Sequence, residues 1–285
     1  MILLFGPNGY IGSEFKKQLS ERKIQFISWQ GARKTSFDQL QTLFKFNKIS
    51  YVINAAGYTG SPNIDACELN KSETFYGNVL WPQMLVHFCQ INNITLGHVS
   101  SGCVYNGKKS DGSGFSEGDE PNFSFRQNNC SFYAGTKALA ETAISSYKNN
   151  YIWRLMIPFE KKDNSKNYIS KILAYSKVLQ TENSISNKEE FVSACIECII
   201  KNVPFGTYNV VNTGSITTEA LVNKLKNTIA KNKDFNLISE KELYKNYVNT
   251  PRSNCVMDNS KLLNTGIKMK SIEESLDYCL NNWTI

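Results

Sequence analysis

Short apolar runs alternate with amphipathic stretches along the first half of the chain. Apolar runs at 2–5, 24–28 and 51–55 predict buried strands, and amphipathic stretches from about Tyr10 and at 37–46 predict helices between them. Such alternation is typical of repeated βαβ units, whose strands form a parallel sheet. The opening pattern therefore predicts an α/β fold.

The same alternation continues through the middle of the chain. We expect a helix through 80–89, a strand at 96–101, a helix beginning near Ser131 and a strand at 151–157. Pro158 is expected to end that last strand, because proline has no backbone N–H to donate to a neighbouring strand. The regular pattern loosens after this point.

Residues beyond Pro158 are rich in Lys, Asn and Ser, with one more strand-like run near 208–211 and a final helix around 272–280. We predict a Rossmann-type doubly wound parallel sheet in residues 1–158, which would bind a dinucleotide. A smaller C-terminal lobe, mainly residues 159–285, would bind substrate and be interleaved with the sheet through its strand-like run.

Composition excludes several classes of protein. The 285 residues are 41% hydrophobic, and no apolar run approaches the roughly eighteen residues of a membrane span. The start of the chain, Met1-Ile-Leu-Leu-Phe-Gly, has no basic region or cleavage site, so we expect a cytoplasmic protein without membrane contact. The net charge of +7 is spread along the chain, which predicts no nucleic-acid partner and agrees with small anionic ligands.

Cysteine and histidine usage predicts no metal site. The eight cysteines are scattered, so we expect reduced thiols. Cys195 and Cys198 form a C-x-x-C, but they lie in an amphipathic helical stretch without a second Cys or His pair. His87 and His98 are too far apart in the sequence to form such a pair, and His98 is interpreted as a hydrogen-bonded histidine of a buried strand.

A glycine-rich turn, Gly6-Pro-Asn-Gly9-Tyr-Ile-Gly12, follows the first strand directly and opens a helix. This context predicts a dinucleotide site, because the glycines allow a tight turn and close approach of a pyrophosphate to the helix N-terminus. A tight βα turn without a ligand is the alternative. The residues expected to contact the cofactor are Gly6, Asn8, Gly9, Tyr10, Ile11, Gly12, Ala55, Ala56, Gly57, Asn78, Tyr133 and Lys137.

The end of the second strand indicates which dinucleotide binds. NAD-binding chains offer an acidic residue to the adenosine ribose there, whereas this chain reads Ser28-Trp-Gln-Gly-Ala-Arg33-Lys34. An arginine suits a 2′-phosphate, so we predict NADPH in preference to NADH. The alternative is that Arg33 is a solvated loop residue.

Tyr133-x-x-x-Lys137 places a phenol and an ammonium on one helix face, and we expect the ammonium to lower the phenol pKa. Ser101, at the end of a strand, would help hold a carbonyl oxygen while Tyr133 donates a proton to it. These are the parts of a ketone reductase. Cys103 is not needed for that reaction, so it indicates either a second reaction or a small buried apolar residue.

These residues resemble the extended short-chain dehydrogenase/reductases that act on nucleotide sugars, over essentially the whole chain. Within that group the chain is similar to the UDP-4-keto-6-deoxy-D-glucose 3,5-epimerase/4-reductases that form UDP-L-rhamnose. The matching stretches are Asn54–Asp65, Ser101–Tyr105, Glu120–Phe123, Ser131–Lys137, Asn167–Ile172 and Pro251–Asn254.

The resemblance implies roles for further residues. Cys103 and Lys171 would act in epimerisation, Arg252 would bind the diphosphate of the nucleotide sugar, and Thr59 and Asn63 would line the substrate cleft. Ser101, Cys103 and Tyr133 would contact the substrate as well. The alternatives are a solvated helix lysine for Lys171, a surface salt bridge for Arg252, and turn residues for Thr59 and Asn63.

The resemblance implies a bifunctional enzyme that converts UDP-4-keto-6-deoxyglucose to UDP-L-rhamnose with NADPH, as a homodimer. One alternative is a reductase alone, similar to dTDP-4-dehydrorhamnose reductase, which typically lacks the cysteine. Another is a non-catalytic regulatory subunit that keeps the dinucleotide pocket.

Overall fold

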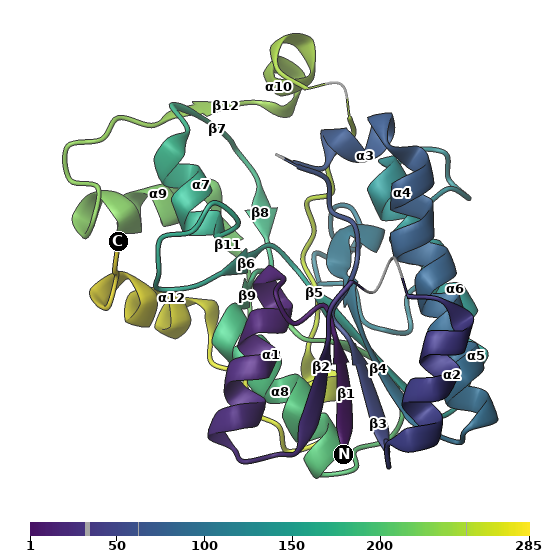
Figure 1. Ribbon diagram of the computed structural model, residues 1–285. Helices are drawn as coiled ribbons and strands as arrows, with labels where there is room; N and C mark the ends of the chain where they lie inside the picture. Colours follow the sequence, from purple (N-terminus) through teal and green to yellow (C-terminus); the bar gives the residue numbers. More distant parts are fainter. Residues whose placement is uncertain (32–34, 62, 249) are drawn as a thin grey trace.

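The computed structural model describes residues 1–31, 35–61, 63–248 and 250–285. Within these ranges its centre is a six-stranded sheet with the strand order β10-β5-β4-β3-β1-β2, in which every neighbouring pair is parallel (Figure 1). The strands are β1 (Ile2–Phe5), β2 (Phe26–Trp29), β3 (Tyr51–Asn54), β4 (Thr95–Ser101), β5 (Asn150–Leu155) and β10 (Gly206–Asn209). The predicted α/β fold with a parallel sheet is confirmed.

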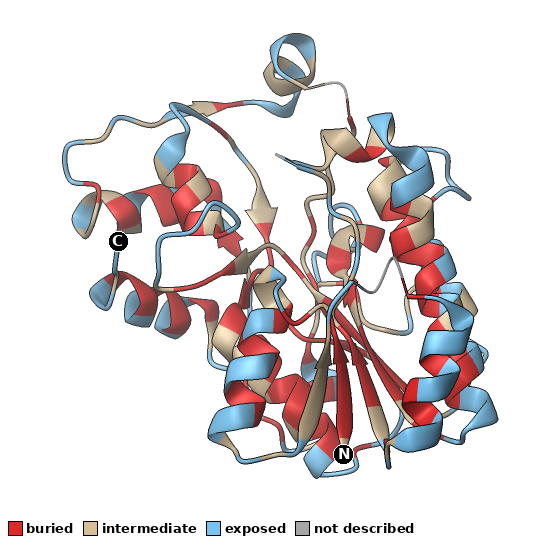
Figure 2. Ribbon diagram, viewed as in Figure 1, coloured by how far each residue is buried: buried red, intermediate tan, exposed pale blue. Residues whose placement is uncertain are grey.

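Helices cover both faces of the sheet. Successive side chains of a strand point to opposite sides, so each buried strand places apolar residues on both faces. Ile2 and Leu4 pack in a cluster with α1 and α8, whereas Leu3 and Phe5 pack in a second cluster with α2, α5 and α6. Figure 2 shows buried residues on the strands and on the helix surfaces that face them. These helices are α1 (Tyr10–Glu21), α8 (Lys188–Ile200), α2 (Phe37–Phe46), α5 (Trp81–Ile91) and α6 (Phe132–Ser145).

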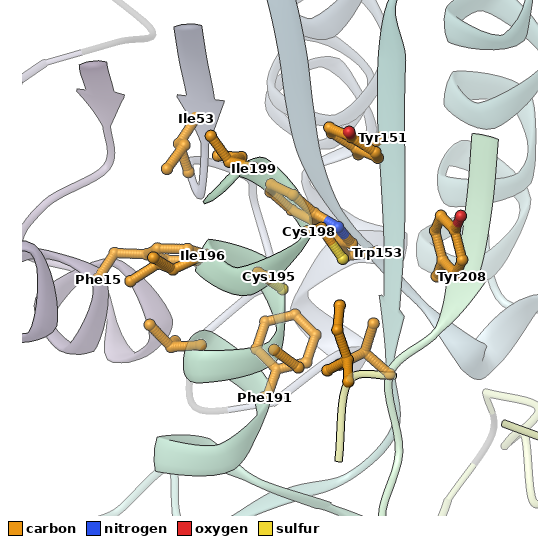
Figure 3. Close-up of a cluster of buried hydrophobic side chains, with 14 of the residues drawn as sticks. Phe15, Ile53, Tyr151, Trp153, Phe191, Cys195, Ile196, Cys198, Ile199 and Tyr208 are labelled. Atoms are coloured by element: carbon orange, nitrogen blue, oxygen red, sulfur yellow. The ribbon is translucent and has the colours of Figure 1, made fainter. Parts of the chain in front are cut away.

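The C-x-x-C lies inside the first of these clusters. Cys195 and Cys198 are fully buried beside Phe191, Trp153 and Tyr208 (Figure 3). All eight cysteines are free thiols in the structure. Cys195 and Cys198 therefore contribute to apolar packing between α8 and the sheet.

A second lobe with its own apolar cluster is formed by α7, α9 and α12. Short strand pairs and further helices connect and extend it. These elements are β6 (Pro158–Phe159), α7 (Tyr168–Ala174), β7 (Lys177–Leu179), β8 (Glu182–Asn183), β9 (Ser186–Asn187), β11 (Ile216–Thr217), α9 (Thr218–Asn227), β12 (Asn236–Ile238), α10 (Glu240–Asn246), α11 (Ser260–Leu263) and α12 (Ile272–Asn281). Residues after 158 thus build this lobe, but they also supply β10 and α8 to the sheet; the division at 158 stays a prediction.

Some boundaries differ from the predicted ones. β5 ends at Leu155, two residues early, because the chain turns at Ile157, whose φ of 38° lies in the left-handed region. Pro158 then opens β6, which pairs with β9, so this proline begins a new strand after the turn. In the described part of the chain, no helix has the length and apolar character needed to cross a membrane.

Candidate active site

The turn between β1 and α1 is packed so closely that only glycine fits. Gly6 has a φ of 76°, and a Cβ on Gly6 would lie 2.7 Å from the backbone nitrogen of Ala56. A Cβ on Gly12 would lie 1.9 Å from the carbonyl oxygen of Gly6. The first turn of α1 therefore sits directly against the loop, where its free N–H groups can face an anion.

A cavity of about 1100 Å³ extends from this turn across the carboxyl end of the sheet. Its walls include Gly6, Gly9, the segment 55–57, parts of 71–80 and Phe132, the residue before Tyr133. The volume suits a large ligand, and the bare glycine turn at one end suits its pyrophosphate. The residues present therefore fit a dinucleotide that reaches from the turn to the start of α6.

The other residues near the turn that are predicted to contact the cofactor differ in their exposure. Asn8 is exposed, and Tyr10 and Ile11 are half-buried in the first turn of α1. Arg33, the residue predicted to select NADPH, lies outside the described residues.

Asn78 lies in a π-helical segment, η2 (Tyr76–Leu80), which follows α3 (Asp65–Leu69) and α4 (Lys71–Phe75). Its amide accepts from the backbone N–H of Tyr58 at 2.7 Å, donates to the carbonyl of Tyr58 at 2.9 Å and donates to Thr136 Oγ1 at 3.2 Å. Asn78 thus ties the segment after β3 to the helix that carries Tyr133, and its contact with a cofactor stays a prediction.

Ser101, Cys103 and Tyr133 come together at the carboxyl end of β4. Ser101 ends β4, and its Oγ accepts a hydrogen bond of 3.2 Å from the backbone N–H of Cys103 on the short helical turn η3 (Gly102–Val104). A hydrogen bond with Ser101 lowers the pKa of Tyr133, but burial raises the pKa more strongly, and the nearby Cys103 raises it further. Burial also raises the pKa of Cys103, to about 12, so its thiol holds a proton.

The pKa of the Tyr133 phenol is raised by burial, not lowered as the sequence predicts from Lys137. The Nζ of Lys137 donates to the carbonyl oxygen of Val99 at 2.9 Å and lies 3.4 Å from Nε2 of His98, so the amine points toward β4. Burial lowers the pKa of Lys137 to about 8. In this arrangement burial, which penalises both ions, outweighs attraction between ammonium and phenolate.

A buried ion pair lies behind these residues on the next turn of α6. Glu141 accepts hydrogen bonds from two nitrogens of the Arg154 guanidinium, with a shortest distance of 2.6 Å, and both side chains are less than a tenth exposed. Arg154 also donates to the hydroxyl of Tyr105, whose own O–H lies near the carbonyls of Ser116 and Asp119. This network fixes α6 against β5 and the loop that follows η3.

The residues predicted to bind substrate lie on separate elements. Arg252 pairs with Asp65 at 2.8 Å. Asn63 accepts from the backbone N–H of Asp65, as a turn residue does, and Thr59 is exposed. Lys171 lies on α7 in the second lobe, and burial together with the nearby Lys166 lowers its pKa.

The structure brings Ser101, Cys103, Tyr133 and Lys137 together, and the role of Lys171 stays a prediction. Within the described ranges, no hydrogen bond or ion pair joins Lys171 to that group. Sequence reasoning missed Asp65 as a partner of Arg252 and Asn54 as a partner of His98. The stretch Asn54-Ala-Ala-Gly57 was a usable signal, because Asn54 ends β3 beside the glycine turn.

The fold and the site define the class of the protein. A parallel Rossmann sheet and a glycine turn beside a dinucleotide-sized cavity place it among the dinucleotide-binding proteins of the Rossmann type. The chain belongs to the RmlD substrate binding domain family, which it matches over residues 1–285.

Curated relatives support this assignment. A bifunctional dTDP-4-dehydrorhamnose 3,5-epimerase/dTDP-4-dehydrorhamnose reductase of Arabidopsis thaliana is 31% identical over 282 residues, covering 96% of this chain and 90% of the relative. A trifunctional UDP-glucose 4,6-dehydratase/UDP-4-keto-6-deoxy-D-glucose 3,5-epimerase/UDP-4-keto-L-rhamnose-reductase of the same plant is also 31% identical over 282 residues. This chain spans only 41% of the length of that trifunctional relative.

Solved structures confirm the fold. The L780 UDP-rhamnose synthase of Acanthamoeba polyphaga mimivirus has a TM-score of 0.90 at 23% identity, covering 99% of this chain and 98% of that chain. The dTDP-4-dehydrorhamnose reductase of Bacillus anthracis, solved in complex with NADP, has a TM-score of 0.79 at 18% identity, covering 97% and 96%.

Proposed function

We propose that this chain epimerises UDP-4-keto-6-deoxy-D-glucose at C3 and C5 and then reduces C4 with NADPH to form UDP-L-rhamnose. The observation that carries the proposal is the position of the Cys103 thiol, two residues beyond Ser101 and beside Tyr133, at the site that would hold the ketone. The names of the Arabidopsis relatives, which include both an epimerase and a reductase, support it.

The reduction needs groups that hold the C4 oxygen and supply a proton. Ser101 and Tyr133 would both bind that oxygen, and the buried phenol of Tyr133 keeps its proton until the oxygen becomes negative. The bound cofactor supplies the hydride to C4. Tyr133 then gives its proton to the oxygen, and Lys137 stands one helical turn away to restore it.

The epimerisation needs a base and an acid on opposite faces of the sugar. Protons on C3 and C5 are acidic because the enolate places its charge on the C4 oxygen. Lys171, whose pKa is lowered by burial, would take a proton from carbon as the neutral amine. Cys103, which keeps its proton because burial raises its pKa to about 12, would return one to the other face. Solvent then restores both groups.

The direct test is to incubate the purified chain with UDP-4-keto-6-deoxyglucose and NADPH in deuterated water and to follow the sugar by NMR. We expect deuterium at C3 and C5 and formation of L-rhamnose. Cys103→Ser should slow the exchange at least about a hundredfold while the reduction of pre-epimerised substrate continues. Cys130→Ser, which changes a second half-buried thiol near the site, is the matched control and should exchange normally.

Lys171 is tested in the same way. Lys171→Met should stop exchange at the carbons that use this base, whereas Lys166→Met, which changes an exposed neighbouring lysine, should not. Full exchange in both Cys103→Ser and Lys171→Met contradicts the epimerase proposal.

A reductase acting alone is the second candidate. The name of the Bacillus anthracis relative, a dTDP-4-dehydrorhamnose reductase, supports it. Such an enzyme would consume NADPH with pre-epimerised substrate and leave UDP-4-keto-6-deoxyglucose without deuterium.

A further inference from the structure

A line of buried polar side chains runs from Lys137 through His98 to Asn54. The Nζ of Lys137 lies 3.4 Å from Nε2 of His98, and Nδ1 of His98 lies 3.0 Å from Nδ2 of Asn54. His98 and Asn54 are both 0% exposed, on the adjacent strands β4 and β3. Because no solvent reaches these side chains, each donor has to find its acceptor within the group.

The amide of Asn54 has one orientation that satisfies its neighbours. Its Oδ1 accepts from the indole N–H of Trp81 at 3.2 Å and from the backbone N–H of Ala56 at 3.2 Å. Both of these groups can only donate. A rotated amide would place its NH₂ against two N–H groups, so the NH₂ of Asn54 faces His98.

This orientation determines which nitrogen of His98 carries the proton. Nδ1 must accept from Asn54, so the neutral ring carries its hydrogen on Nε2, facing Lys137. Burial and the neighbouring Lys137 hold the pKa of His98 well below its usual value, so the ring is neutral. The ammonium form of Lys137 would therefore place its own N–H groups against the Nε2–H of His98, which is unfavourable. The neutral amine form would accept the Nε2–H with its lone pair and still donate to the carbonyl oxygen of Val99.

We propose that His98 is a positioning residue that favours the neutral amine of Lys137 by donating its Nε2–H to Nζ. The role builds on the proposed reduction. After Tyr133 protonates the C4 oxygen, the ammonium of Lys137 passes a proton to the phenolate, and His98 stabilises the amine that remains. Water then returns the proton to Lys137.

Other titratable groups around Lys137 favour its ammonium form over the neutral amine. Cys103 on η3 and Glu141 on α6 favour the ammonium. Glu141 is already held by Arg154 from β5, which limits its pull on Lys137. Among the groups that act on Lys137, His98 on β4 is the one whose N–H opposes the ammonium by direct contact.

The tautomer can be measured without substrate, because the chain has only two histidines. Nitrogen-15 NMR of the histidine-labelled full chain should show one ring with hydrogen on Nε2 and a bare Nδ1 from pH 6 to 9. His87→Phe removes the other ring, which is exposed on α5, and assigns the signal. A hydrogen on Nδ1 of His98, or a doubly protonated ring, overturns the proposal.

The pH dependence of kcat/KM for the reduction tests the effect on Lys137. We expect kcat/KM to fall at high pH as Lys137 loses its proton. In His98→Phe this fall should occur about one pH unit higher, because the Nε2–H that disfavours the ammonium of Lys137 has been removed. His87→Phe should leave the fall in place. A downward shift shows that His98 accepts from an ammonium, and no shift shows that it has no influence; either result overturns the proposal.

These measurements separate failure of this role from failure of the reduction itself. If the wild-type chain oxidises NADPH with no 4-keto sugar, the proposed reduction is contradicted. If the wild-type chain turns over and His98→Phe has the same high-pH fall in kcat/KM, only the role of His98 is contradicted. Where His98→Phe does not fold, the tautomer of the wild-type ring decides.

Discussion

The carboxylate of Asp65 holds the guanidinium of Arg252 at 2.8 Å, across 187 residues of sequence. The pair joins the start of α3 to the segment after α10. Nη1 of Arg252 and Oδ1 of Asp65 are buried, and neither has a hydrogen-bond partner among the described residues. Asp65 thus fixes one side of the guanidinium, while the buried Nη1 is a donor that no described residue satisfies.

Arg252→Ala should raise the KM for the nucleotide sugar by about tenfold or more, because a charge-assisted contact to a phosphate is worth about 1.5–3 kcal/mol. The kcat should change little, since Arg252 would hold a part of the substrate that does not react. Steady-state kinetics measure both. Arg126→Ala, which removes an exposed arginine, is the control, and an equal KM in the two variants contradicts the assignment of Arg252.

Gly12→Ala should abolish binding of the dinucleotide. The added Cβ would lie 1.9 Å from the carbonyl oxygen of Gly6, and backbone on both sides leaves no room, so the turn must move. Titration with NADPH followed by fluorescence or calorimetry measures the loss. Gly118→Ala places a Cβ no nearer than 3.8 Å to the atom it meets and should bind as the wild type does. Normal binding by Gly12→Ala shows that the dinucleotide does not use this turn.

Lys137→Met should be more stable than the wild type at pH 7 and inactive. Burial lowers the pKa of Lys137 in the folded chain to about 8, below its usual value of 10.5, so its charged form is penalised on folding. The penalty is fully present below pH 8 and disappears as the pH rises toward 10.5, where the unfolded chain also loses the proton. We expect a difference of about 3 kcal/mol at pH 7, measured by urea unfolding. A difference that stays constant from pH 7 to 10 contradicts this account.

Glu141→Gln should destabilise the fold by about 3 kcal/mol, because it leaves the buried charge of Arg154 without its partner. Denaturant unfolding gives the value. Glu273→Gln removes the carboxylate of an exposed pair with Lys224 and should change stability by less than about 0.5 kcal/mol. Equal effects in the two variants would show that solvent reaches the Arg154 pair.

The sequence predicts the fold well, because apolar periodicity reports which faces of strands and helices are buried. It also predicts Ser101 at the end of β4 and places Tyr133 and Lys137 on one face of α6. It does not predict that Nζ of Lys137 points to His98 and Val99, because helical spacing places two residues on a face without determining where long side chains end.

The sequence also does not predict contacts between residues of distant segments. Nothing in the local sequence of Arg252 indicates Asp65, since that contact depends on how the last part of the chain packs against α3. The same limit applies to Asn78, whose amide holds Tyr58 and Thr136 from two other elements. Sequence spacing identifies which residues lie near the chemistry, and tertiary packing determines their protonation and contacts.

The contribution of β10 and α8 to the sheet has a consequence for biosynthesis. A ribosome that has released only residues 1–158 exposes β5 as an open edge strand and leaves the cluster around Ile2 and Leu4 without α8, one of the two helices that cover it. Exposed edges and uncovered apolar faces favour association between chains. The nascent polypeptide must therefore wait for residue 209, well into the second lobe, before the sheet that supports Ser101 is complete.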